Sequence, residues 1–230
     1  MIRKNIFLQF LYLLSSKAIK KDLYLEGGAA LSFIYGQNRV FSNDLDFTIE
    51  NKKLLKKFLN SIEEIIKEIN PAKYSIRNVS NNKIIIKSGR LMILQIDVYV
   101  VSAKLFLWEE KELNLNNKKF TLRVHSFIDL FAEKITNIFQ KDRCEFKDII
   151  DINNIYKTIK TSVDPENFSI YLRNKFVGKK MHIQIKNNPI LSYLNRKIAF
   201  KKSFLTSPKF KGKSFDKEFE SCRRIMEIYL

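Results

Sequence analysis

The stretch from residue 23 to residue 50 constrains the fold more than any other part of the chain. It begins with an apolar strand pattern, passes through Gly27 and Gly28, and continues as a short apolar helical pattern. After a polar turn, Asp44 and Asp46 stand two positions apart in a second strand pattern. Because side chains alternate between the faces of a strand, both carboxylates point to the same side. Two adjacent carboxylates repel each other, and a divalent cation between them removes that cost.

The glycine pair indicates a second kind of site. Glycine has no Cβ, so its backbone can approach a ligand closely and adopt a positive φ. A helix that begins at such a turn directs its N–H groups and its positive dipole end at an anion. We therefore predict that Gly27 and Gly28 bind phosphate beside a metal site at Asp44 and Asp46. Mg²⁺ (or Mn²⁺) suits these oxygen ligands. The alternative is an ordinary turn followed by a solvent-exposed acidic strand end.

In this order the motifs resemble those of a known family. The pattern resembles the core of the AbiEii/AbiGii toxins, which are DNA polymerase β-like nucleotidyltransferases. The matching residues are 27–31 (GGAAL), Arg39, Ser42 and 44–47 (DLDF). The resemblance implies an enzyme that transfers a nucleoside monophosphate from a nucleoside triphosphate, with Ser42 beside the glycine pair as a nucleotide-binding residue. Ala29 stands where the family pattern has a hydroxyl residue.

The resemblance also implies an α+β fold, in which a polymerase β-like core with a mixed sheet flanked by helices precedes a helical, basic C-terminal domain. The expected boundaries are residues 1–124 and 125–230. Hydrophobic periodicity predicts the individual elements. We expect helices over residues 3–20, 51–70, 126–140, 145–160, 165–177, 189–201 and 215–229, strands over 23–25, 44–49, 74–79, 83–87, 91–101 and 120–124, and an irregular charged loop over 105–118.

Asp97 is the third candidate metal ligand. It interrupts an otherwise apolar strand pattern, where an unpaired charge is costly. Polymerase β-like enzymes take a third carboxylate from a strand beside the Asp-x-Asp strand, and the resemblance therefore implies that Asp97 completes the site. Its role would be to bind metal and to accept the proton of the attacking hydroxyl. The alternative is a strand-end aspartate that faces water.

Two later helices resemble the second half of the same family pattern. The matching residues are Glu133-Lys134, Arg143, Lys147-Asp148 and Asp151. The resemblance implies that Lys134 contacts the nucleotide phosphates and that Asp148 supports the active site, both as catalytic residues. An ammonium group suits this task as a compact charge. The alternative is that both are ordinary helix residues that form ion pairs.

The charge of the chain indicates a polyanionic partner. The formal net charge is +18 with a pI near 9.8. The stretch 173–213 contains no acidic residue, and its basic residues are expected to neutralise RNA phosphates. Interleaved aromatic residues could stack on bases, although a place in the core is the favoured interpretation for them. The candidate RNA-binding residues are Arg173, Lys175, Lys179, Lys180, Arg196, Lys197, Lys201 and Lys202, and the interleaved aromatic residues are Phe176, Tyr193, Phe200, Phe204 and Phe210.

These observations predict a Mg²⁺-dependent nucleotidyltransferase whose acceptor is an RNA hydroxyl, with the tRNA 3′ end as the favoured acceptor. A protein side chain, a small molecule such as an aminoglycoside, or an RNA-binding role without catalysis are the alternatives. The resemblance further implies the toxin of a toxin–antitoxin or abortive-infection system, with a cognate antitoxin that need not contact the enzyme.

The remaining features favour a cytoplasmic protein. Cys144 and Cys222 are far apart and form no zinc-ligand spacing with the two histidines, so a reducing compartment is the simpler interpretation. The apolar stretch 6–14 follows two basic residues, which also fits a signal peptide, but an amphipathic helix on the core is favoured. The stretch is too short to span a membrane, and no membrane partner is expected.

Overall fold

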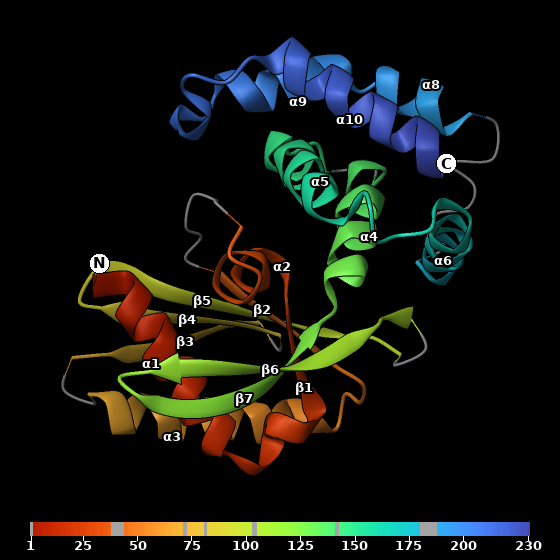
Figure 1. The fold of residues 1–230 in the computed structure, drawn as a ribbon. Coiled ribbons are helices and arrows are strands. Elements are labelled where there is room, and N and C mark those ends of the chain that lie inside the picture. The colour runs from red at the N-terminus through yellow and green to blue at the C-terminus, as the bar shows by residue number, and fades with distance from the viewer. Residues whose placement is uncertain are drawn as a thin grey trace. The chain divides into compact units, whose positions relative to one another are not determined.

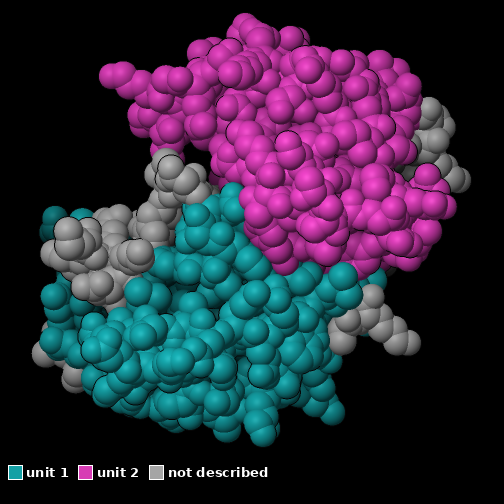
Figure 2. Space-filling view, viewed as in Figure 1, with its two compact units in different colours: residues 1–126 teal, residues 127–230 magenta. Residues whose placement is uncertain are grey.

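A computed structural model of the 230-residue chain describes residues 2–37, 44–70, 73–80, 82–102, 105–140, 143–179 and 188–230. Its elements are drawn in Figure 1. The chain divides into two compact units, Met1–Ser126 and Phe127–Leu230 (Figure 2). In the described ranges, the strands all belong to the first unit, and the second unit is helical.

The first unit is built on a seven-stranded mixed sheet with the strand order β3-β4-β5-β2-β1-β7-β6. The pairs β2–β5 and β1–β7 are parallel, and the other neighbours are antiparallel. This arrangement confirms the predicted mixed sheet. The strands are β1 Leu23–Glu26, β2 Asp44–Ile49, β3 Ser75–Ser80, β4 Lys83–Ser88, β5 Leu91–Val100, β6 Trp108–Leu115 and β7 Lys118–His125.

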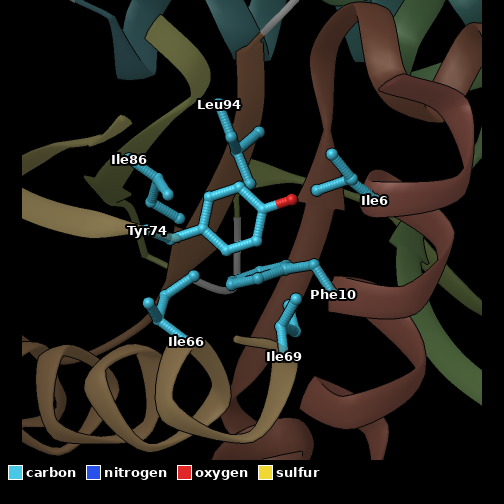
Figure 3. Close-up of a pocket in the computed structure, with 7 residues that line it drawn as sticks. All are labelled: Ile6, Phe10, Ile66, Ile69, Tyr74, Ile86 and Leu94. Carbon is cyan, nitrogen blue, oxygen red and sulfur yellow. The ribbon is translucent and has the colours of Figure 1, made fainter. Parts of the chain in front are cut away.

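Two helices pack on the apolar face of this sheet. They are α1 Ile2–Ser16, followed by the 3₁₀ turn η1 Ala18–Asp22, and α3 Leu54–Ile69. The rings of Phe47 on β2 and Phe58 on α3 lie 5.5 Å apart, and both side chains are buried. A small apolar cavity remains between the helices and the sheet (Figure 3). Its lining residues are Ile6, Phe10, Ile66, Ile69, Tyr74, Ile86 and Leu94.

The prediction of an irregular loop over residues 105–118 is wrong, because most of this stretch is strand β6. This strand pairs with β7 through a hairpin turn at Asn116 and Asn117, whose φ values are 50° and 64°. Two consecutive residues with positive φ match the twist of a tight hairpin, and Asn tolerates this conformation. The charged residues Glu109 and Lys111 are half-buried on β6, which hides the alternation that normally marks a strand.

The second unit packs its helices around aromatic side chains. Its elements are α4 Phe127–Ile138, α5 Phe146–Ile159, α6 Pro165–Gly178, α8 Pro189–Leu194, α9 Lys197–Leu205, the 3₁₀ turn η4 Pro208–Phe210, and α10 Phe215–Tyr229. Tyr193 and Phe219 stack with centroids 4.4 Å apart, and Phe200 lies against both. The core interpretation of the interleaved aromatic residues is confirmed for Phe176, Tyr193 and Phe200, which are buried.

The single helix predicted over residues 189–201 is two helices. The break falls at Arg196, whose backbone has φ −92° and ψ 0°. Its guanidinium donates to the carbonyls of Ile138, Gln140 and Arg143, which lie at and beyond the end of α4. These hydrogen bonds satisfy carbonyls that a helix terminus leaves without partners.

No helix in the described ranges combines the length and apolar character that crossing a bilayer requires.

Replacement of Phe58 by alanine should destabilise the first unit by about 3–5 kcal/mol, because a fully buried ring leaves a cavity under the sheet. Urea denaturation followed by circular dichroism measures this loss. Lys57→Ala, an exposed change on the same helix, is the control and should stay within about 0.5 kcal/mol of wild type. A loss below about 1 kcal/mol for Phe58→Ala would contradict the packing described here.

Candidate active site

Three adjacent strands place carboxylates in register. Glu26 on β1 is the cross-strand partner of Asp46 on β2, and Asp46 is in turn the partner of Asp97 on β5. Residues that are directly opposite point to the same face of a sheet. The three side chains therefore form one carboxylate row, comprising Glu26, Asp46 and Asp97. Glu26 is buried, and the other two are half-buried.

The position of Asp97 beside the Asp-x-Asp strand is the one expected from the sequence. Its carboxylate accepts a hydrogen bond of 2.5 Å from Gln95 Nε2, and Lys83 Nζ lies 3.7 Å from its other oxygen. Asp44 is the cross-strand partner of Gln95 and shares the face of Asp46. Gln95 thus donates to Asp97 from the strand position opposite Asp44, and Lys83 offsets part of the negative charge of Asp97.

Gly27 is held against the carboxylate row by close contact with Asp46. Its φ is +67°, a backbone conformation that residues other than glycine rarely adopt. A Cβ at this position would lie 3.0 Å from Asp46 Cγ and 3.1 Å from Asp46 Cβ, and closer still to Oδ2. The strand-to-helix turn and the carboxylate can occupy these places only because residue 27 has no side chain.

The glycine pair begins a short helical segment, as predicted. This segment consists of α2 Gly27–Ala29 and the π-helical η2 Ala30–Ile34. The first N–H groups of a helical segment have no partners within it, and groups of this kind can bind an anion. The predicted nucleotide-binding residue Ser42 and the motif residue Arg39 lie outside the described residues.

The chemistry of these side chains fits a hard divalent cation. Asp44, Asp46 and Asp97 offer oxygen donors, which Mg²⁺ and Mn²⁺ prefer, and they would be its ligands. In the described part of the chain, no three His, Cys, Asp or Glu side chains converge into a finished coordination cluster. Mg²⁺ normally takes one or two carboxylates and completes its shell with water and substrate phosphates, so a partial protein site is what it needs.

Glu26 was not among the residues predicted from the sequence. It ends β1 directly before the glycine pair, and its carboxylate lies 3.7 Å from His125 Nδ1 on β7. The sequence signal for Glu26 is its position, because the last residue of a strand that ends in a glycine turn lies next to that turn. Which face Glu26 occupies follows only from the register between β1 and β2.

The second unit contains a buried ion-pair cluster at the other predicted catalytic residues. Lys134 Nζ on α4 lies 2.9 Å from Asp148 Oδ1 and 2.9 Å from Asp151 Oδ2, both on α5. Arg143 Nε lies 3.0 Å from Asp148 Oδ2. Lys134 is 4 % exposed, so within this unit it joins α4 to α5. The proposed phosphate contact of Lys134 and the supporting role of Asp148 stay predictions.

The electrostatics of this cluster fix the charge of Asp148. Burial alone would raise the pKa of its carboxyl, but the positive charges of Lys134 and Arg143 outweigh burial and lower the pKa to about 2. Asp148 is therefore ionised at neutral pH, although it is 1 % exposed. A buried charge of this kind is tolerated because it is paired and hydrogen-bonded.

Several basic residues predicted to bind RNA form contacts within the second unit. Lys175 is buried, and its Nζ lies 2.5 Å from Asp129 Oδ1, so it offers RNA little surface and is not among the contacts proposed below. Lys179 pairs with Glu133 and Thr136. Arg196 is occupied by the end of α4. Lys180 lies outside the described residues, whereas Arg173, Lys197, Lys201 and Lys202 are exposed.

Comparison with known families decides what kind of protein carries this site. The family model described as the nucleotidyl transferase AbiEii toxin of type IV toxin–antitoxin systems matches residues 9–218. The chain belongs to the AbiEii nucleotidyltransferase toxin family. The predicted family and enzyme class are thereby confirmed. A comparison with curated proteins gave no match.

Solved structures share the fold of this AbiEii family member. MenT4, a nucleotidyltransferase toxin from Mycobacterium tuberculosis H37Rv, is 14% identical with a TM-score of 0.55, and the match covers 97% of this chain and 89% of that chain. ANT(2″)-Ia in complex with adenylyl-2″-tobramycin is 11% identical with a TM-score of 0.50, and the match covers 76% of this chain and 97% of that chain. These likenesses confirm the nucleotidyltransferase-like fold.

Gly27→Ala should lower the rate of nucleotidyl transfer by roughly a hundredfold, because the new methyl group must displace the Asp46 carboxylate by a fraction of an ångström or more. Gly89→Ala is a matched control. Gly89 has a similar φ of +58°, but a Cβ there would meet nothing within 4 Å. Both variants strain a backbone with positive φ, but only Gly27→Ala also displaces Asp46, so only Gly27→Ala should lose activity. Equal rates for the two variants would show that contact with Asp46 is unimportant.

Asp148→Asn should destabilise the protein by about 2 kcal/mol at pH 7, the value that a pKa shift from 3.8 to about 2 implies. A carboxyl with a lowered folded-state pKa stabilises the protein above pH 4, and this contribution disappears as the pH falls towards 2. The stability gap between variant and wild type, measured by urea unfolding, should therefore close over that interval. Glu63→Gln, an exposed change in the middle of α3, is the control and should stay within about 0.5 kcal/mol of wild type at every pH. A gap independent of pH would contradict the ion-pair account.

Proposed function

We propose that this AbiEii family member transfers a nucleoside monophosphate from a nucleoside triphosphate to an RNA hydroxyl, with Mg²⁺ or Mn²⁺ as cofactor. The tRNA 3′ end is the proposed acceptor. The observation that carries the proposal is the register of Asp46 with Asp97, beside a glycine turn that contacts Asp46. The arrangement supports the proposal because it sets carboxylate oxygens, which hard cations prefer, beside a glycine turn that begins a helical segment.

In this proposal the residues of the first unit have separate roles. The backbone at Gly27 and Gly28 binds the triphosphate, and Asp44 and Asp46 would hold the cation. Asp97 accepts the proton of the acceptor hydroxyl, whose oxygen attacks the α-phosphorus in line. The bond to the bridging oxygen then breaks, and pyrophosphate leaves. The bound cation would supply charge stabilisation for the attacking and leaving oxygens. Lys134 and Asp148 are proposed to assist from the second unit.

RNA is the favoured acceptor because of the charge of the chain. The net charge of +18 exceeds what solubility requires, and it favours binding to a polyanion. Arg173, Lys197, Lys201 and Lys202 are exposed within the acid-free stretch, so they are the proposed phosphate contacts of the second unit. As a member of a type IV toxin family, the protein is expected to act with a cognate antitoxin.

A labelling experiment tests the proposed reaction. Purified protein is incubated with Mg²⁺, total cellular RNA and each nucleoside triphosphate labelled at the α-phosphate. We expect label in a tRNA-sized band, and a loss of roughly a hundredfold or more in Asp46→Asn and Asp97→Asn. Glu112→Gln, which removes an exposed acid from β6 of the same sheet, should keep the wild-type rate.

The labelled species identifies the acceptor. Label in protein would assign transfer to a side chain, and label in a small molecule would assign transfer to a metabolite or antibiotic. Either result would contradict the RNA acceptor while leaving the enzyme class intact. Transfer that persists in Asp46→Asn would contradict the assignment of the site itself.

The double variant Lys201→Gln with Lys202→Gln should weaken RNA binding and reduce the slope of log Kobs against log salt by about 1 to 2, since each phosphate contact contributes about 0.7 to 0.9. Fluorescence anisotropy with labelled tRNA measures this between about 50 and 200 mM salt. The matched control is Lys56→Gln with Lys57→Gln on α3, which removes the same charge from exposed positions of the first unit. Equal losses in both double variants would show that only net charge matters.

A further inference from the structure

Two aromatic side chains are exceptionally exposed. Among the described residues, Tyr99 and Trp108 are the aromatic side chains with more than a third of their surface exposed, at 45 % and 41 %. Both belong to the sheet of the first unit. The aromatic residues interleaved with the lysines of the second unit are instead buried or half-buried. A half-exposed ring on a strand leaves part of its surface open to solvent, where another aromatic group can stack.

Trp108 stands in line with the carboxylate row. It is the cross-strand partner of His125 on β7. The parallel pairing of Leu25 with Val124 brings His125 beside Glu26, and the 3.7 Å between their side chains agrees with this. Glu26 is in turn opposite Asp46. Trp108 therefore shares the face of Asp46 and lies three strands away, at about 14 Å for a spacing of about 4.8 Å between strands.

The surroundings of Trp108 hold the ring in place and add positive charge. The guanidinium of Arg123 lies 4.5 Å from the ring centroid, and the ring of Tyr24 lies 5.4 Å away. Arg123 is itself anchored by a hydrogen bond to the Lys21 carbonyl and by Glu110 at 3.6 Å. A fixed ring with a cation beside it suits a nucleotide, which presents a π-face together with a phosphate.

We propose that Trp108 stacks an unpaired base of the acceptor RNA. This inference rests on the proposed function and deepens it. The distance from Asp46 leaves room for the terminal nucleotide at the carboxylates, so the stacked base belongs to a nucleotide upstream of the attacking hydroxyl. An acceptor with an unpaired 3′ end is selected in this way, because a base inside a duplex cannot offer its face to a side chain.

Trp108 is the single tryptophan of the chain, so its fluorescence reports on the stacking directly. The wild-type protein is titrated, without nucleoside triphosphate, with a stem-loop RNA that ends in three or so unpaired nucleotides. The matched RNA carries abasic sites at those positions. We expect saturable quenching by the first RNA, and about tenfold weaker binding with little quenching by the abasic one.

Two results of the titration would overturn the proposal. The first is binding of the RNA, seen by anisotropy of a label on its 5′ end, without any quenching. Trp108 would then serve another partner, such as a protein. The second is full quenching by nucleoside triphosphate alone, which would assign the ring to the donor base.

Variants separate this inference from the proposed function. Trp108→Ala should raise the KM for RNA about tenfold, while kcat and the KM for nucleoside triphosphate stay within about twofold. Trp108→Phe should restore most of the affinity, because it keeps a stacking ring. Leu91→Ala, an exposed change at the β4–β5 turn, is the control and should change nothing.

The two possible failures differ in what the wild type does. Normal RNA labelling by wild type and an unchanged KM in Trp108→Ala would overturn the stacking alone. An absence of RNA labelling by wild type, together with base-dependent quenching, would overturn the proposed reaction and retain the stacking.

Discussion

The contact between Gly27 and the carboxylate of Asp46 is the constraint on which the site depends. It joins the end of β1, the start of α2 and the middle of β2, and it permits no side chain at residue 27. Because Asp46 is also in register with Asp97, the same contact fixes the glycine turn relative to β5. The proposed phosphate-binding backbone and the proposed metal-binding carboxylates are therefore positioned by one close approach rather than by independent loops.

The acidic side chains of the two units lie in different surroundings. In the second unit, Lys134 and Arg143 neutralise Asp148 and Asp151 within a buried cluster, which is the arrangement expected of a structural network. In the first unit, the carboxylate row sets three acids side by side on neighbouring strands, with Lys83 and His125 at its ends. Adjacent carboxylates repel one another, and a divalent cation relieves that repulsion. This contrast supports the first unit as the site of nucleotidyl transfer.

The sequence was sufficient to predict the features that depend on local patterns. The Asp-x-Asp spacing, the glycine turn and the lone charge at Asp97 each follow from short-range rules. Features that depend on distant residues were not predictable. Glu26 enters the row only through the register of β1 with β2. Lys175 looked like a surface lysine because its partner, Asp129, lies 46 residues away. Strand β6 was not predicted because its half-buried positions include charged residues, which removes the usual alternation of apolar and polar residues.

The most direct test of this account is thermal stability with Mg²⁺ and a non-hydrolysable nucleoside triphosphate analogue. A ligand that binds the folded state raises its stability in proportion to the logarithm of its concentration over Kd. We predict that the Tm of the wild type rises only when metal and nucleotide are both present, and that Asp46→Asn, compared at its own baseline Tm, shows no such rise. A rise of equal size without metal, or in Asp46→Asn, would contradict a metal-assisted nucleotide site at the carboxylate row.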